Sequence, residues 1–164
     1  MAGITGQITS TTLKKLQAQN DGVSARVAAI VSADPHLAAI GIRSMAAHNI
    51  SVDVSEKLGN TTYPALLVYC DKLTNSMKEK FRRFSGKAHL VVEIRHSQDK
   101  LDSLEAHTQV YVDAVCALLD DSRGDWGSGS FYPGGYDVSY EPVVRGGRNL
   151  LQKAKVSFEV EVSK

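Results

Sequence analysis

The stretch YDVSYEPVVRGGRNLLQKAKVSFEVEV, residues 136–162, decides the fold of this chain. Residues 136–145 and 149–162 are patterned as two β-strands, and Gly146-Gly147 between them readily takes the positive φ angles of a tight turn. In the second strand apolar and polar side chains alternate, so one face packs and the other meets water or a partner. The outward row is Lys153, Lys155, Ser157, Glu159 and Glu161. We therefore predict a long C-terminal β-hairpin with one buried face.

Two further core strands are predicted upstream of this hairpin. TYPALLVYC, residues 62–70, is an apolar run opened by a proline that holds Tyr63 extended, which indicates a central strand buried on both faces. Residues 87–95 alternate with the period of a strand, so that Ala88 and His89 begin opposite faces. Residues 49–62 are polar with early alternation and predict a short strand or an extended loop.

The helical segments are recognised by their apolar spacing. Residues 98–119 carry one apolar stripe, which predicts an amphipathic helix of about six turns. Residues 10–32 also have helical spacing, although Asn20-Asp21-Gly22 allows a break into two shorter helices. Asp34-Pro35 is a good opening for a second short helix over residues 36–47. Residues 1–9 have no period and predict a flexible N-terminal arm, either frayed or ordered on a partner.

Together these elements predict one α+β domain over residues 1–164, with helices packed on one face of a largely antiparallel or mixed β-sheet. The composition, 43% apolar and 23% charged, is that of an ordinary folded domain. A formal net charge of +1 excludes a global field that would draw the chain onto nucleic acid or a membrane. Because no apolar run reaches the roughly 18 residues of a membrane helix, we expect a cytosolic chain with no membrane contact.

The chain has no residue pattern typical of a catalytic, cofactor or metal site. The histidines are not spaced with cysteine or acidic residues as zinc ligands are, and neither a nucleophile elbow nor a GxxxxGK phosphate loop occurs. These histidines are His36, His48, His89, His96 and His107. Cys70 and Cys116 lie among apolar residues and are predicted to be small buried hydrophobes. We therefore expect no enzyme activity, no cofactor and no metal.

Residues 121–135, DSRGDWGSGSFYPGG, are rich in glycine and predict a loop long enough to be functional. Trp126, Phe131 and Tyr132 place large apolar surface on this flexible frame, a pattern that suits an interface anchor. An equally good interpretation is that the three rings fold back over the sheet.

Residues 78–87 form the one candidate patch for nucleic acid or another anionic partner. Its basic residues are Lys78, Lys80, Arg82, Arg83 and Lys87. They gather around Phe81 and Phe84, and basic residues with interleaved aromatics can grip a phosphate backbone and stack on bases. The simpler interpretation, which we favour, is a solvated segment whose two phenylalanines pin it to the core.

The sequence RGGRN, residues 145–149, resembles a glycine-rich anion loop only loosely. As a hairpin turn flanked by Arg145 and Arg148 it needs no ligand, and this is the interpretation that we favour. The two arginines nevertheless remain candidate interface residues.

The order of these elements resembles that of the tail terminator, or tail completion, proteins of long-tailed bacteriophages. The resemblance is carried by TYPALLVYCDKL, AHLVVEIRH, the helix that follows to Leu119, YPGGYDVSYEPVV and KAKVSFEVEV, which together span residue 62 to the C-terminus. It lies in order and pattern rather than in a diagnostic motif, and head completion or stopper proteins of the phage neck share it.

The resemblance implies a virion protein at the head-proximal end of the tail, assembled in the host cytoplasm and without an active site. Such proteins form a ring, usually of six subunits, that binds the tail tube on one face and the head-tail connector or stopper on the other. Residues 121–135 and the turn at Gly146-Gly147 are then candidates for axial contacts. Residues 78–87 are candidates for contact with a neighbouring subunit or with DNA passing through the channel. A nucleic-acid-binding module is the alternative from a different functional class.

Overall fold

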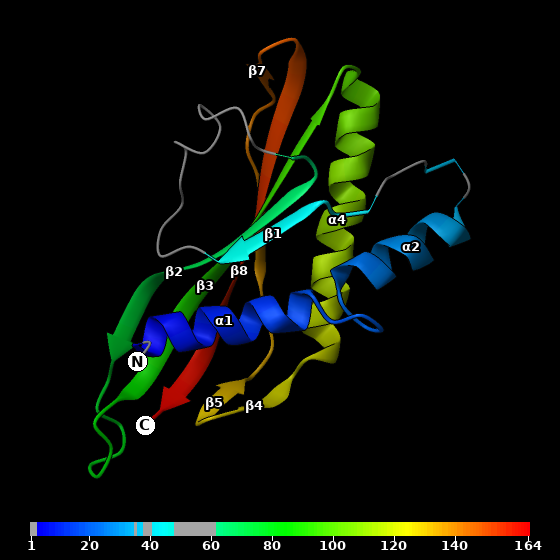
Figure 1. Ribbon diagram of the computed structural model, residues 1–164. Coiled ribbons are helices and arrows are strands. Elements are labelled where there is room, and N and C mark those ends of the chain that lie inside the picture. Colours follow the sequence, from blue (N-terminus) through cyan, green and yellow to red (C-terminus); the bar gives the residue numbers. More distant parts are fainter. Residues whose placement is uncertain (1–2, 35, 38–40, 48–61) are drawn as a thin grey trace.

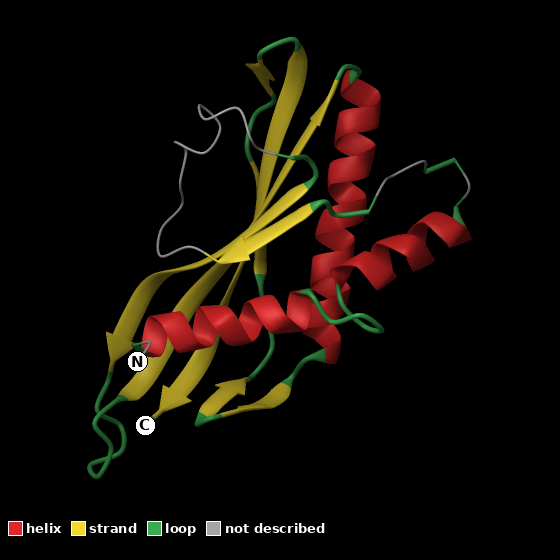
Figure 2. Ribbon diagram, in the orientation of Figure 1, coloured by secondary structure: helices red, strands yellow, loops and turns green. Residues whose placement is uncertain are grey.

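A computed structural model describes residues 3–34, 36–37, 41–47 and 62–164, and it confirms an α+β fold (Figures 1 and 2). The described part contains an eight-stranded mixed sheet in the order β1-β2-β3-β8-β5-β4, with β6 and β7 also paired to β8. In chain order the elements are α1 (Ile4–Leu16), α2 (Val23–Ala33), β1 (Ser44–Ala47), β2 (Ala65–Asn75), β3 (Ser85–Gln98), α4 (Leu101–Asp121), β4 (Gly124–Gly127), β5 (Ser130–Tyr132), β6 (Asp137–Tyr140), β7 (Val144–Gly146) and β8 (Asn149–Ser163).

Strand β8 is a central strand of the sheet, because both of its edges are paired with other strands. On one side it pairs with β3 in an unbroken antiparallel register from Ser85↔Ser163 to Gln98↔Leu150. On the other side β5, β6 and β7 follow one another along its edge. Its inward row of apolar side chains is buried and its glutamates are exposed, so the predicted alternation is confirmed.

The predicted C-terminal hairpin is also confirmed, with two corrections. Its first strand is divided into β6 and β7, between which the register with β8 shifts by one residue. The division contains Pro142, which has no N–H group to donate to a sheet ladder. Gly146 pairs with Asn149, so the tight turn consists of Gly147 and Arg148 rather than of Gly146-Gly147, with Gly147 at a φ of +77°.

Strands β2 and β3 confirm the two predicted core strands and extend beyond them. Five consecutive residues at the start of β2 are buried, as expected of a strand covered on both faces. The middle of β3 is likewise buried on both faces, including Glu93 and Arg95, which are 1% and 0% exposed. Arg95 Nε donates to Glu93 Oε1 at 2.6 Å, and the Tyr69 hydroxyl donates to Glu93 Oε2 at 3.3 Å. Such pairing is what a buried charge requires.

The short helix predicted over residues 36–47 is wrong where the structure describes it. Residues 44–47 form β1, which runs parallel to β2 from Ser44↔Ala65 to Ala47↔Val68. Pairing with β2 overrides a weak helical pattern, because the backbone N–H and C=O groups on that edge of β2 need partners. The strand or extended loop predicted over residues 49–62 lies outside the described residues, apart from Thr62.

The flexible arm predicted over residues 1–9 is wrong from Ile4 onward, because α1 begins there. Ile8 is buried in the core, and Thr12 Oγ1 donates to the Ile8 carbonyl at 2.8 Å. The long helix over residues 10–32 is divided, as the alternative prediction allowed, into α1 and α2. Gly22 lies at the break, where a Cβ atom would come 2.2 Å from the Ala18 carbonyl oxygen.

The helices lie on one face of the sheet, with α4 packed against β3 and β8 (Figure 1). Helix α4 confirms the predicted amphipathic helix, and its buried residues from Val110 to Leu119 enter the same core as Ile94 and Val156. Helix α2 packs on α4, and α1 crosses β1, β2 and β3. In the described ranges no helix is both long and apolar enough to cross a membrane.

Residues 121–135 are not a plain loop, because they contain the hairpin of β4 and β5. Ser128 and Gly129 form its two-residue turn with φ angles of +52° and +73°, the left-handed pair that suits a tight hairpin. Gly129 is also needed for space, since a Cβ atom there would come 2.1 Å from the Ser163 carbonyl oxygen. Gly129 therefore marks the turn between β4 and β5.

Candidate interaction surfaces

The candidate contact residues lie at two opposite ends of β8. The loop of residues 76–83 joins β2 to β3 beside Ser163, whereas the turn at Gly147 and Arg148 lies at the start of β8. A strand of 15 residues is roughly 45 Å long, so these two ends cannot share one binding site. In Figure 1 the loop projects below the C-terminus and β7 lies at the top.

The loop of residues 76–83, called the basic tip below, exposes its cations and one aromatic ring. Phe81 is fully exposed and Met77 is more than half exposed, whereas Phe84 is only 8% exposed. The expectation that both phenylalanines pin this segment to the core is therefore wrong for Phe81. Lys80, Arg82 and Arg83 are all exposed.

The ion pairing of the basic tip leaves most of its positive charge available. Arg82 Nε lies 3.4 Å from Glu79 Oε2, which also accepts a hydrogen bond from Ser163 Oγ at 2.9 Å. The remaining cations of the tip make no ion pair within the part of the chain that the structure describes. These cations are Lys78, Lys80 and Arg83.

The base of the basic tip is well ordered by hydrogen bonds. The backbone N–H of Phe84 donates to the Lys164 carbonyl at 2.9 Å, and the Lys164 N–H donates back at 2.8 Å. Asn75 Oδ1 accepts from the N–H groups of Met77 and Ser85, at 3.2 Å each. Phe81 is therefore held out in solvent by a structured loop.

In the β4–β5 hairpin, unlike in the basic tip, two of the three aromatic side chains pack against the core. Tyr132 is 1% exposed, and its ring packs 5.4 Å from those of Trp126 and Phe158. Trp126 Nε1 donates to the Ser122 carbonyl at 2.7 Å, and Lys15 Nζ lies 5.0 Å from the indole ring centre. The rings of Trp126 and Tyr132 thus fold back over the sheet, which excludes Tyr132 as an interface anchor.

Phe131 is the member of that aromatic set that faces outward, with 47% of its surface exposed. Together with Lys78 and Glu79 it lines a hollow of about 230 Å³. The structure therefore brings Phe131 next to the basic tip. The sequence patterns of the basic tip and of residues 121–135 did not indicate that the two segments are neighbours. They become neighbours because β5 pairs with the end of β8.

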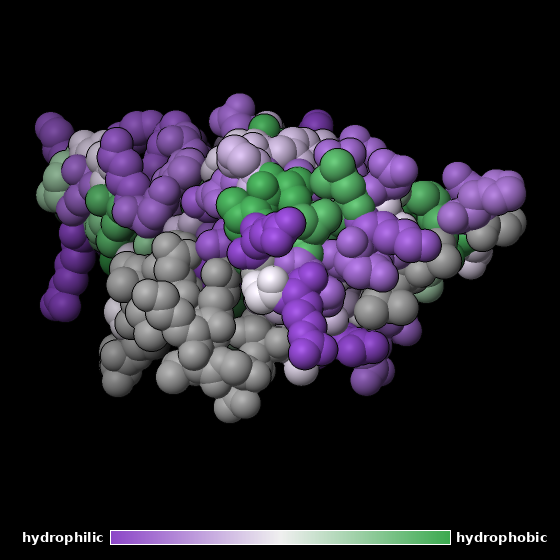
Figure 3. All heavy atoms as spheres, turned by 90° about the horizontal axis from the view of Figure 1, so that it is seen from above, coloured by the Kyte–Doolittle hydropathy of each residue, from purple (hydrophilic) through white to green (hydrophobic). Residues whose placement is uncertain are grey.

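The opposite end of the sheet carries Arg145 and Arg148, both exposed. Val144 in β7 and Leu101 at the start of α4 add exposed apolar surface near them. Figure 3 views this end and shows a hydrophobic area framed by hydrophilic residues. The turn end thus combines cationic and apolar surface, although the sequence singled out only its two arginines.

The outward row of β8 is largely engaged within the chain. Lys155 Nζ lies 2.9 Å from Glu141 Oε1, and Lys87 Nζ lies 2.7 Å from Glu159 Oε2. The hydrogen bond from Lys87 lowers the pKa of Glu159 below its ordinary value. Because these charges pair within the chain, the case for this row as a surface that meets a partner is weaker.

A groove between α4 and β6, called the α4 groove below, is a candidate interaction surface that the sequence patterns did not single out. It measures about 430 Å³ and is lined by Asp102, Glu105, Ala106, Gln109, Tyr140 and Gln152. Asp102 and Glu105 are exposed, and Tyr140 presents 47% of its surface. The sequence signal for it is that residues 101–121 contain acidic residues but no lysine or arginine.

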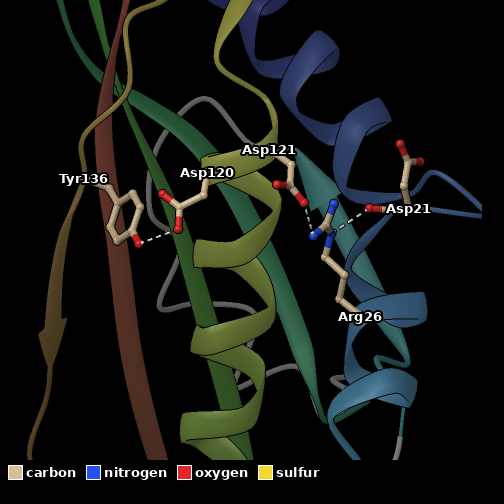
Figure 4. Close-up of polar contacts among 5 residues, drawn as sticks. All are labelled: Asp21, Arg26, Asp120, Asp121 and Tyr136. Carbon is tan, nitrogen blue, oxygen red and sulfur yellow. Dashed lines mark hydrogen bonds and ion pairs between the residues drawn. The ribbon is translucent and has the colours of Figure 1, made fainter.

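The acidic residues at the two ends of α4 differ in their pairing: those at the C-terminal end bind other side chains, and those at the N-terminal end do not within the described ranges. Figure 4 shows the C-terminal end, where Arg26 binds Asp121 at 2.7 Å and the Tyr136 hydroxyl donates to Asp120 at 3.2 Å. The ion pair with Asp121 fastens α2 to α4, and Arg26 also donates to the carbonyl oxygen of residue 21, in the turn before α2, at 2.9 Å. Asp102 and Glu105 make no ion pair within the described ranges, so the α4 groove is negatively charged.

The described histidines do not form a metal centre, and within the described residues no group of three or more His, Cys, Asp or Glu side chains could hold a metal ion. His89 contacts Asp71 on the sheet. His96 and His107 lie with ring centres 5.6 Å apart under α4. Burial, reinforced by His107, lowers the pKa of His96 to about 4, and burial also lowers the pKa of His107. Both rings are therefore neutral at pH 7.

Cys70 and Cys116 are free and partly buried rather than fully buried. Burial raises the pKa of both thiols above the ordinary value. Because the thiolate is the reactive form, this shift makes both cysteines poor nucleophiles at neutral pH.

Comparison with known proteins does not assign the chain to a family, since no protein-family model and no curated protein sequence matches it.

Proposed function

We propose that this chain is a structural protein of a long-tailed phage virion, a tail terminator that closes the tail tube as a ring of six copies and forms the joint with the head. The resemblance over residues 62–164 suggests this role, and the fold has the element order on which the resemblance rests. The proposal involves no catalytic step. Its partners are other copies of the chain, the tail tube protein and the head-tail connector or stopper.

The observation that carries the proposal is the distribution of exposed contact residues over two distant ends of one sheet. Phe131 lies exposed at one end, and Arg145 and Arg148 lie at the other. A subunit with a single partner needs one such surface. A subunit of a joint needs two, because each face of its ring meets a different protein.

In the proposed mechanism the ring acts through its shape and its contacts. Bound at the end of the tube, it blocks the addition of further tube subunits, and its free face becomes the docking surface for the filled head. Closure of the ring requires a heterologous contact, in which two different surfaces of the same chain complement one another.

Electron microscopy of the purified protein mixed with tail tubes tests this function. Rings at one end of the tubes, absent from tubes alone, are the expected result. A chain that never associates with tubes, or that is found in the capsid shell of the virion, overturns the proposal. A location on the connector without tube contact would instead indicate the alternative neck role, head completion or stopper.

Two variants sharpen the test by addressing the two ends separately. Arg145→Glu with Arg148→Glu alters the turn end, and Phe131→Ala alters the opposite end. All three side chains are exposed, so we expect both variants to fold. If the two ends serve different partners, one variant loses tube binding and the other loses connector binding.

Nucleic-acid binding is the second candidate, favoured by Lys80 and Arg83, which flank the exposed Phe81 and make no ion pair within the described ranges of the chain. It predicts binding to single-stranded DNA or RNA that weakens steeply between about 50 and 200 mM salt. Phe81→Ala should then reduce stacking while Lys80→Glu reduces the salt dependence. No binding at low salt removes this candidate.

A further inference from the structure

The basic tip has the features of an interface anchor. Phe81 stands fully exposed at the end of a loop whose base is fixed by Asn75, Phe84 and Lys164. Lys80 and Arg83, which make no ion pair among the residues that the structure describes, flank it. A fully exposed aromatic ring on an ordered loop becomes favourable once a partner removes its surface from water. The charge around the ring indicates that this partner is acidic.

The α4 groove offers the complementary features. Its volume of about 430 Å³ lies in the range of pockets that hold compact groups. Ala106 and Tyr140 supply apolar wall, while Asp102 and Glu105 stand exposed beside it without an ion pair within the described residues. Gln152 Oε1, in the same lining, is buried and accepts no hydrogen bond within the described part.

We propose that the basic tip of one copy of this chain inserts Phe81 into the α4 groove of a second copy, with Lys80 and Arg83 facing Asp102 and Glu105. The positive surface and the negative surface belong to the same chain, so the occupant of the groove is a second copy. This inference deepens the proposed function, on which it rests, by naming the contact between neighbouring subunits.

The distance between the two surfaces makes this contact intermolecular. Gln152 lies eleven residues before Ser163 on β8, which corresponds to about 36 Å along the strand, and the basic tip lies beyond Ser163. The tip cannot fold back onto its own groove. Because the tip and the groove are different surfaces, the contact is heterologous and propagates head to tail until a ring closes.

Sedimentation velocity on the full chain tests the contact. We expect the wild type to associate as concentration rises and higher salt to weaken the association, since part of it is charge pairing. Phe81→Ala should raise the dissociation constant about 30-fold, the effect of removing one anchor residue. Leu73→Ala, which trims an exposed apolar residue of β2 outside both the tip and the groove, should leave it unchanged. Equal association of Phe81→Ala and the wild type overturns the proposal, as does a wild type that stays monomeric.

Mixing two defective variants gives a sharper result. Phe81→Ala keeps an intact groove, and the double variant Asp102→Lys with Glu105→Lys keeps an intact tip. Neither should assemble alone, whereas their mixture should form a 1:1 dimer and nothing larger, because only one competent contact exists. A mixture that stays monomeric, or that forms rings, contradicts a tip-in-groove contact.

The two proposals fail in different ways. If Phe81→Ala still forms rings on tail tubes, the tip-in-groove contact is wrong and the terminator function stands. If the wild type associates through tip and groove but never binds tubes, the contact stands and the function is wrong.

Discussion

The basic tip and the β4–β5 hairpin lie at the same end of the sheet, and both carry large aromatic residues. The two segments differ in whether these side chains are buried or exposed. Tyr132 and Trp126 pack over Phe158, whereas Phe81 stands in solvent. The difference follows from pairing. β5 pairs with the end of β8, so Tyr132 lands on the core face, whereas the tip lies beyond the last β3–β8 pair, Ser85↔Ser163.

An aromatic residue in a polar segment is therefore buried when its strand pairs with a neighbour and its side chain faces the core, as at Tyr132, and it is exposed when it lies past the end of the sheet, as at Phe81. Phe131, on the opposite face of the paired strand β5, stays half exposed. The consequence is a difference in role. Trp126 and Tyr132 contribute to stability, whereas Phe81 is available for recognition. Substitutions should separate these roles, and the following effects are ordered from the largest to the smallest.

Tyr132→Ala should lower the free energy of unfolding by about 3–5 kcal/mol, since it empties a buried aromatic site against Phe158. Chemical denaturation followed by circular dichroism measures the effect. Phe131→Ala, next to it but half exposed, is the matched control and should cost far less. Equal losses in the two variants would contradict the difference in packing.

Acidification should remove up to about 3 kcal/mol of stability through His96 alone. Its pKa is about 4 in the folded chain and 6.5 ordinarily, so between these values the unfolded state binds more protons. Stability is therefore lost as the pH falls from 6.5 to 4.

Denaturation at pH 7 and pH 5 measures this loss, and His96→Leu should reduce it. In an acid titration, the unfolding midpoint of Tyr132→Ala should lie at a higher pH than that of the wild type. The midpoint of Phe81→Ala should lie at the same pH as that of the wild type. A pH dependence unchanged by His96→Leu would assign the loss to other groups.

Gly129→Ala should cost about 1–3 kcal/mol, because it strains a backbone at a φ of +73° and brings Cβ to 2.1 Å from the Ser163 carbonyl oxygen. Gly127→Ala is the matched control. Gly127 has a similar φ of +80° but open space around it, so its cost reflects the backbone alone. Thermal unfolding of both variants compares them, and equal costs would show that the close approach to Ser163 is unimportant.

Phe81→Ala should change the free energy of unfolding by less than about 0.5 kcal/mol, since the ring is fully exposed. Phe84→Ala, three residues on and buried, should cost several times more. Denaturant unfolding of the two variants provides the measurement. A destabilised Phe81→Ala would mean that the ring packs on the chain in solution, which would also remove it as an anchor.

Local periodicity accounts for the parts of the fold that could be predicted. The alternation from Ala154 to Val162, the apolar run in residues 62–70 and the helical stripe of residues 98–119 each require one kind of neighbour, a core on the corresponding side. Residues 121–135 could not be predicted in this way, because five glycines hide two short strands whose pairing depends on β8.

The candidate surfaces were partly predictable for a related reason. The basic tip is one continuous run of sequence, so its charge and its rings were visible, although the exposure of Phe81 was not. The α4 groove joins residues from α4, β6 and β8. No local pattern connects Asp102 with Gln152.

By itself the sequence determined the class of the fold and its long C-terminal hairpin, because hydrophobic periodicity acts within each segment. Only the tertiary structure decided which aromatic side chains are buried, where the two ends of β8 lie, and that Asp102 and Glu105 are left without ion pairs in the described part. Burial and charge pairing depend on neighbours that are distant in the chain, and the register of β8 with β3, β5 and β6 is what brings those neighbours together.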